Sequence, residues 1–178
     1  LPKAYSDAQF AFYKGTLSGL KQQPDRWKNG VKLVDSTLGE ALGRRYVDKY
    51  FPANAKKQAL ELVDNLLAAY RASFATLSWM TEPTQQAAIA KLNKITVKIG
   101  YPDSWRNYDA VTINKSTLIA NLRSATSAEN TRQLNKLGKP VDRGEWQMTP
   151  QTVNAYYDPS YNEIVFPAAV LQAPFFSP

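Results

Sequence analysis

The residue types that catalyse most group transfers and bind most transition metals are missing from this chain. Its 178 residues include no histidine and no cysteine. A Ser-His-Asp or Cys-His nucleophile system needs an imidazole, and catalytic zinc is held by three protein ligands, commonly two histidines and a glutamate. The sequence therefore excludes these nucleophile systems, thiolate zinc sites and disulfides within the chain. We expect no catalytic residue and no metal ligand in it.

Oxygen ligands remain as candidates for a metal site. Asp158, Asn162 and Glu163 are close in sequence and suit calcium or magnesium better than zinc. Their spacing is not that of a calcium-binding loop, so we interpret them as turn formers. A carboxylate pair for glycoside hydrolysis stays open, because nothing distinguishes two among the fifteen acidic residues. Gly15–Gly19 lacks the lysine and the length of a phosphate loop and is interpreted as a loosened helix end.

The pair Asn154-Ala155 begins a segment that alternates like the first arm of a hairpin. An unpaired strand edge offers a row of N–H and C=O groups, which is what an extended peptide needs for binding. A side-chain amide adds one donor and one acceptor at a fixed position. Taken alone, the pair is better interpreted as an ordinary hairpin edge whose asparagine faces water.

Short segments along almost the whole chain change that interpretation. They are Phe12–Gly19, Arg26–Lys28, Leu42–Val47, Lys49–Phe51, Leu77–Met80, Ala90–Leu92, Ile99–Asp103, Val141–Trp146 and Val153–Phe176. In residues and in order they resemble the neprilysin-like zinc metallopeptidases, the family that includes the endothelin-converting enzymes. The resemblance implies a zinc-dependent metalloendopeptidase that hydrolyses peptides.

The resemblance also implies roles for particular residues. Asn154 would hold the main chain of a peptide substrate with its side-chain amide, and Ala155 with its backbone carbonyl. Val170 and Phe175 match the apolar residues that line the pocket for the side chain just after the scissile bond. The family's zinc-binding His-Glu-x-x-His helix follows these strands, so we expect it beyond Pro178. This chain alone would be inactive and bind no zinc, and the remaining catalytic domain would be its partner.

Three substitutions depart from the family's pattern in this segment. Ala169 replaces the usual glycine, Val170 replaces isoleucine, and Ala173 replaces the first of two prolines. Each can alter the local turn or the size of the pocket. The substrate preference of better-known members therefore does not transfer to this chain.

Most of the elements that must position these residues are predicted to be helices. Apolar residues spaced by three and four predict one long helical face from Ala59 to Leu77. Thr81 is expected to cap the next helix, with Pro83 in its first turn. A further helix is predicted from about Ser116 to Leu137, ended by Gly138, with a buried stripe of Leu118, Leu122, Ala125, Leu134 and Leu137. Residues 6–20 and 25–51 predict two or three shorter helices.

Two stretches predict β-structure. Thr96–Ile99 is short and β-branched, and Val153–Tyr157 with Glu163–Phe166 predicts a hairpin across a turn at Asp158–Asn162. Isolated hairpins are marginal in water. We therefore expect the apolar side chains of this tail to need a partner surface from the rest of the protein; they are Val165, Phe166, Val170, Leu171, Phe175 and Phe176.

The predicted fold is mainly α: a multi-helix domain followed by a short β-hairpin that begins a thermolysin-like catalytic domain. Residues 1–150 would form the helical region, including most of the roof over the cavity, and residues 151–178 the substrate edge and the start of the catalytic domain. Trp27, Trp79 and Trp146 are expected to be packed. The rival hypothesis is a self-contained, non-catalytic helical scaffold or peptide-binding module.

Composition limits the partners and the compartment. Hydrophobic residues make up 44% of the chain and charged residues 21%, a globular composition. The net charge is +7, but the basic residues are spread along the chain, so we expect no nucleic-acid partner. We expect no membrane span and no signal peptide in this chain. Without cysteines, and with Gly30 where animal members carry one, a bacterial protein is favoured, periplasmic or secreted.

Overall fold

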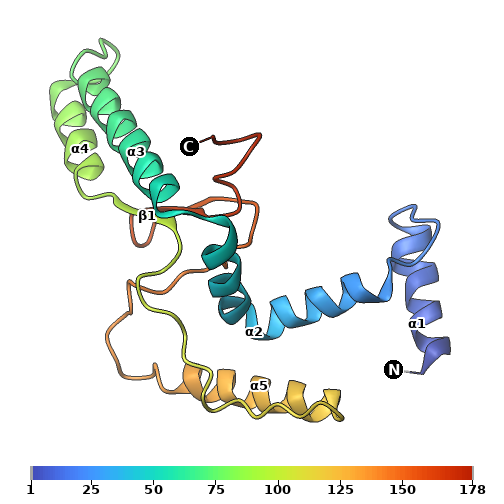
Figure 1. The fold of residues 1–178 in the computed structure, drawn as a ribbon. Helices are drawn as coiled ribbons and strands as arrows, with labels where there is room; N and C mark the ends of the chain where they lie inside the picture. Colours follow the sequence, from blue (N-terminus) through green and yellow to red (C-terminus); the bar gives the residue numbers. More distant parts are fainter. Residues whose placement is uncertain (1, 178) are drawn as a thin grey trace. The chain divides into compact units, whose positions relative to one another are not determined.

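The computed structural model describes residues 2–177. It divides into two units, Leu1–Ser36 and Thr37–Pro178, which are described here one at a time. The fold is mainly helical with a small sheet (Figure 1). This confirms the predicted fold class, whereas the division into domains at residues 150 and 151 stays a prediction.

The first unit is helical. Helix α1 (Lys3–Gln9) continues directly into a π-helix, η1 (Phe10–Thr16), and α2 (Arg26–Tyr50) begins in this unit. The wider π-type turns are accompanied by side-chain bonds over five residues, from Thr16 Oγ1 to the Ala11 carbonyl and from Ser18 Oγ to the Tyr13 carbonyl. Gly19 has a φ of 69° after the last turn, which agrees with the predicted loosened helix end.

The second unit contains the remaining helices. They are the later part of α2, α3 (Ala53–Phe74), α4 (Glu82–Leu92) and α5 (Leu118–Leu134). The periodicity placed α3, α4 and α5 correctly to within a few residues. Thr81 stands at the N-cap of α4, as predicted, but its hydroxyl lies 2.9 Å from that of Thr84 and does not bond the backbone. Helices α3 and α4 pack side by side (Figure 1).

A three-stranded sheet contacts α3 through its strand β1 (Thr96–Gly100). Its other strands are β2 (Tyr156–Asp158) and β3 (Glu163–Pro167), and the order in the sheet is β1-β3-β2. β2 and β3 form the predicted hairpin, with Tyr156 opposite Val165. β1 pairs with β3 in parallel, with Thr96 opposite Glu163. The sequence predicted each strand but not this parallel pairing.

The first arm of the hairpin is shorter than predicted. It begins at Tyr156 and not at Val153. The backbone N–H of Asn154 donates to the Thr152 carbonyl at 3.0 Å, and the N–H of Ala155 donates to Asn154 Oδ1 at 2.8 Å. These local bonds turn the backbone where the prediction had an extended strand.

The core of the second unit joins helices, strand and tail. Its buried apolar residues come from α2, the link to α3, α3, β1 and the segment after β3, and they are Val47, Phe51, Ala55, Ala59, Val63, Ile99, Ala168 and Leu171. Val165 is fully buried as well. The expectation that the tail needs an outside partner is therefore wrong for Val165 and Leu171, because both are already buried within this chain.

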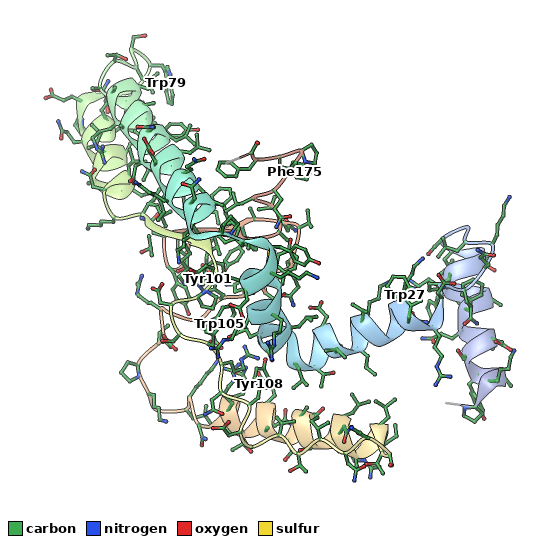
Figure 2. All side chains as sticks on the ribbon, in the orientation of Figure 1. Trp27, Trp79, Tyr101, Trp105, Tyr108 and Phe175 are labelled. Atoms are coloured by element: carbon green, nitrogen blue, oxygen red, sulfur yellow. The ribbon has the colours of Figure 1, made fainter. Side chains whose placement is uncertain are left out.

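Several apolar residues predicted to be buried are exposed in the described part of the chain. Trp27 and Trp79 are 65% and 73% exposed (Figure 2). Of the three tryptophans named above, Trp146, at 9%, is packed as expected. Of the stripe predicted on α5, Ala125 is buried, and Leu118, Leu134 and Leu137 are exposed. Amphipathic spacing marks a face that can be covered, but it does not say by which part of a protein.

Candidate functional site

The predicted substrate edge lies at the free side of the sheet. Asn154 and Ala155 immediately precede β2, which is an edge strand because β3 lies between it and β1. Asn154 is exposed and Ala155 is half-buried. Because the N–H of Ala155 needs an acceptor, the bond from it identifies the Asn154 side-chain atom that faces the backbone as the oxygen. The amide nitrogen is then the atom that Asn154 can offer to a ligand.

The loop before Asn154 connects the edge to the second predicted part of the site. Pro150 is fully buried, and its carbonyl accepts a hydrogen bond from the Ala169 N–H at 2.9 Å. Ala168 is fixed in turn, because its N–H donates to the Gly100 carbonyl at 2.9 Å. Asn154 follows the loop at Pro150, and Val170 follows Ala169. Because Pro150 and Ala169 are joined by a hydrogen bond, the two predicted parts of the site are connected.

The two apolar site residues differ in their surroundings. Val170 is half-buried and packs against the core cluster. Phe175 is 71% exposed and projects from the tail (Figure 2). The structure thus places Val170 firmly and leaves Phe175 with a large apolar surface open. A role for either in a side-chain pocket stays a prediction.

Gln147 holds the edge strand β2 through its first and its last residue. The backbone N–H of Gln147 donates to Tyr156 Oη at 3.0 Å, and Gln147 Nε2 donates to Asp158 Oδ2 at 2.6 Å. Burial raises the pKa of the Tyr156 phenol, although the hydrogen bond from Gln147 acts in the opposite direction. The two hydrogen bonds from Gln147 therefore fix both ends of the three-residue strand β2.

Glu163 corrects the interpretation of this residue as a turn former. Its side chain is 1% exposed, and its Oε2 lies 2.8 Å from Lys98 Nζ. Lys98 Nζ also donates to the Glu145 carbonyl at 3.0 Å. An isolated buried carboxylate is very costly, so this partner is required for its burial. A signal existed in the sequence: Glu163 shares the inner face of β3 with Val165 and Pro167 through the two-residue period of a strand.

A second charged cluster joins α5 to the loop before Trp146. Arg132 lies 2.8 Å from Glu129 and 2.7 Å from Glu145, and Lys136 lies 2.6 Å from Glu145. The hydrogen bond from Arg132 lowers the pKa of Glu129 to about 2. Burial alone would raise the pKa of Glu145, but bonds from Lys136 and Arg132 outweigh it and lower that pKa. Carboxylates held ionised in this way act as structural ion pairs and not as proton donors near neutral pH.

A cavity of about 760 Å³ opens beside this cluster. Its lining includes Tyr101 and Trp105, whose rings stack with centroids 5.9 Å apart (Figure 2). The lining also includes Arg106, which reaches the Glu40 carboxylate at 3.4 Å. Another pair of its lining charges is Lys56 and Asp103, whose charged atoms lie 3.8 Å apart.

The sequence predicts that this chain contributes no metal ligand. Within residues 2–177 no three side chains from His, Cys, Asp and Glu lie together as a metal site, and the whole sequence has neither histidine nor cysteine. Catalytic zinc needs nitrogen, sulfur or oxygen ligands gathered at one point. That no residue of this chain binds the zinc ion stays a prediction. In the same described range, every helix is too short or too polar to span a bilayer.

Family models match both ends of the chain. A model described as peptidase family M13 matches residues 1–102, and another with the same description matches residues 154–178. The chain is 34% identical over 178 residues to "Neutral endopeptidase" of Lactobacillus helveticus, covering 99% of this chain and 27% of that protein. It is 35% identical over 188 residues to "Neprilysin-3" of Drosophila melanogaster, covering 99% of this chain and 23% of that protein.

A solved structure shares the fold of the whole chain. It is zinc metalloprotease ZMP1 of Mycobacterium tuberculosis in complex with an inhibitor, with a TM-score of 0.92 and 52% sequence identity. The match covers 100% of this chain and 27% of that one. The chain thus spans about a quarter of the length of the relatives that it matches.

Proposed function

Because this chain belongs to peptidase family M13, we propose that it is part of a zinc-dependent metalloendopeptidase that hydrolyses peptides. The observation that carries the proposal is the similarity to the M. tuberculosis zinc metalloprotease over the full length of this chain, at 52% identity. When bound, zinc would polarise the scissile carbonyl and lower the pKa of its bound water to about 7. Its ligands would lie outside this chain, which has no histidine.

This chain would supply the edge along which the peptide lies. Asn154 would donate from its amide nitrogen to a substrate carbonyl, and the Ala155 carbonyl would accept from a substrate N–H. Two observations support this role: Asn154 is exposed beside an edge strand, and the bond from the Ala155 N–H fixes the orientation of its amide. Val170 and Phe175 would line an apolar pocket for a substrate side chain.

The experiment is Asn154→Ala in the full-length protein. Losing one substrate hydrogen bond in a closed cleft costs about 1–3 kcal/mol, which is roughly a ten- to hundredfold loss in kcat/KM. The zinc content should stay unchanged, since Asn154 would touch substrate and not metal. Asn130→Ala is the matched control, because Asn130 is also exposed but lies on α5. An unchanged kcat/KM for Asn154→Ala would show that the edge is only structural.

A second measurement separates the peptidase from a self-contained binding module. The isolated chain should neither hydrolyse a fluorogenic peptide nor bind zinc tightly in a calorimetric titration, because only oxygen ligands are present. Tight binding at one site, or cleavage that a chelator stops, would refute this. A full-length protein that binds peptides without hydrolysing them would favour the module.

A further inference from the structure

Two glycines of α2 lie in unusually close contact with the loop that leads to Asn154. A Cβ added at Gly39 would lie 2.8 Å from Thr149 Cγ2, and one added at Gly43 would lie 2.8 Å from Pro150 Cδ. Both glycines are buried. They are four residues apart, so they occupy the same face of the helix. The loop can approach the helix this closely only because Gly39 and Gly43 carry no side chain.

The loop is fixed in this position by hydrogen bonds. Gln151 Nε2 donates to the Gly39 carbonyl at 2.9 Å. The Thr149 and Thr152 hydroxyls lie 3.0 Å apart, and the Thr152 N–H donates to the Thr149 carbonyl at 3.0 Å. Residues 149–152 therefore form a rigid turn seated on α2.

This stretch of α2 is itself held from its other side. The backbone N–H of Glu40 donates to Tyr108 Oη at 3.2 Å, and the Glu40 carboxylate accepts the Arg106 N–H at 2.8 Å. Glu40 lies between the two glycines in sequence, so these bonds hold the part of α2 on which the turn rests to the chain around Tyr108. A rigid support beneath the turn means that a change at the glycines must displace the turn.

The displacement would reach both predicted parts of the site. The N–H of Asn154 donates to the Thr152 carbonyl at 3.0 Å, so Asn154 follows the turn directly. The Pro150 carbonyl accepts from the Ala169 N–H, next to Val170. We propose that Gly39 and Gly43 are positioning residues, which set the location of the Asn154-Ala155 edge and of Val170 relative to each other. This inference rests on the proposed function, because it assigns these glycines to the substrate site named there.

The size of the effect follows from the contact distance. A Cβ at residue 39 would fall about 0.6 Å short of the ordinary van der Waals contact of 3.4 Å with Thr149 Cγ2. Misplacing a catalytic geometry by about 1 Å can cost about a hundredfold in rate. We therefore expect Gly39→Ala to lower kcat/KM about tenfold.

The test is a mutant cycle in the full-length protein. Gly39→Ala is compared with Thr149→Ser and with the double variant, because serine removes the Cγ2 atom that the new Cβ would meet and keeps the hydroxyl. Gly30→Ala is the control, since Gly30 lies in the helical stretch of α2 before the non-helical Leu38 and nothing described lies within 4 Å of its Cβ position. We expect about tenfold lower kcat/KM for Gly39→Ala alone, near wild-type values for the double variant and for Gly30→Ala, and unchanged zinc content.

Two results would overturn the proposal. One is a Gly39→Ala variant that hydrolyses peptides as well as Gly30→Ala does, even if its melting temperature is lower, because the glycine would then be only structural. The other is a loss that Thr149→Ser does not restore, because the loss would then not arise at this contact. Gln151→Met, which removes the bond to the Gly39 carbonyl, covers the case in which Gly39→Ala does not fold; it should lower kcat/KM, and an unchanged value counts against the proposal.

Hydrogen exchange keeps the two proposals distinguishable. If the wild-type protein hydrolyses no peptide, the proposed function fails, whatever the variants do. The Asn154 and Ala155 amides should still exchange faster in Gly39→Ala than in Gly30→Ala if the glycines position the edge. Equal exchange rates in these two variants would contradict the positioning role by itself.

Discussion

Lys98 Nζ lies 2.8 Å from Glu163 Oε2, and the two side chains are only 10% and 1% exposed. The ammonium lies off the direction of a well-aligned hydrogen bond to that oxygen, so the contact is mainly Coulombic. The pair joins β1 to β3, the two strands that run in parallel. It is therefore a connection between segments that are distant in sequence, made by charges that neither strand could bury alone.

Removing the lysine should be strongly destabilising. Lys98→Met leaves the Glu163 carboxylate buried without its partner, which typically costs about 3–5 kcal/mol. The double variant Lys98→Met/Glu163→Met should recover most of this loss, because a buried ion pair can be replaced by packed apolar side chains at little cost. Lys57→Met, at an exposed position of α3, is the control. Urea unfolding of the four proteins measures the differences, and a loss no larger than that of the control would contradict this role.

The Glu129–Arg132 pair predicts an acid-dependent stability. The pKa of Glu129 falls from its ordinary value of 4.5 to about 2 in the folded protein. A lowered folded-state pKa stabilises the protein above pH 4.5, and this contribution is lost as the pH falls toward 2. Glu129→Gln should therefore be less stable than wild type at pH 6, and the gap should close by about pH 2.

The measurement is the free energy of unfolding as a function of pH for both proteins. Because Glu129 is partly exposed, added salt should also narrow the gap. Glu61→Gln, at an exposed position of α3, serves as the control. A gap between Glu129→Gln and wild type that is constant from pH 6 to pH 2 would show that the residue contributes by packing and not by charge.

Two glycines with positive φ allow the cost of backbone strain to be measured separately from the cost of overpacking the core. Gly100 has a φ of 81° and Gly138 a φ of 72°. A Cβ at Gly138 would meet nothing within 4 Å, whereas one at Gly100 would lie 2.4 Å from Phe51 Cε1. Gly138→Ala should cost about 1–2 kcal/mol for the left-handed backbone alone. Gly100→Ala should cost about 1–3 kcal/mol more, because the core cannot accommodate the added atom. Equal losses in thermal or urea unfolding would contradict the packing argument.

The local elements could be predicted from sequence because their signals are local. The periodicity around Ala59 and Val63 predicted α3. Gly138 was expected to end the later helix, but α5 already ends at Leu134, and the positive φ of Gly138 comes four residues further on. Which apolar face is covered is not a local property. Leu66 and Tyr70 share the spacing of Ala59 and Val63, yet in the described chain they are exposed, although α4 packs against α3.

The candidate site also has one part that could be predicted from the sequence and one part that could not. The hairpin that follows Asn154 could be predicted from its turn residues and flanking alternation, and the interpretation of its edge as a substrate edge came from resemblance to a family. The packing of the turn at residues 149–152 on Gly39 and Gly43 could not be predicted. It depends on contacts between residues more than a hundred positions apart, such as Gln151 and Gly39.

The parallel pairing of β1 with β3 has a consequence for how the chain acquires its structure. Thr96 pairs with Glu163, so roughly 65 residues must be looped out before this ladder can form, at a considerable entropic cost. During synthesis on the ribosome, α3 and β1 emerge well before Val165, Ala168 and Leu171, which complete the core around them. The nascent chain must therefore hold a half-covered apolar surface until the strand that closes it has been translated, and such slow, non-local closure is where chaperones or aggregation compete with folding.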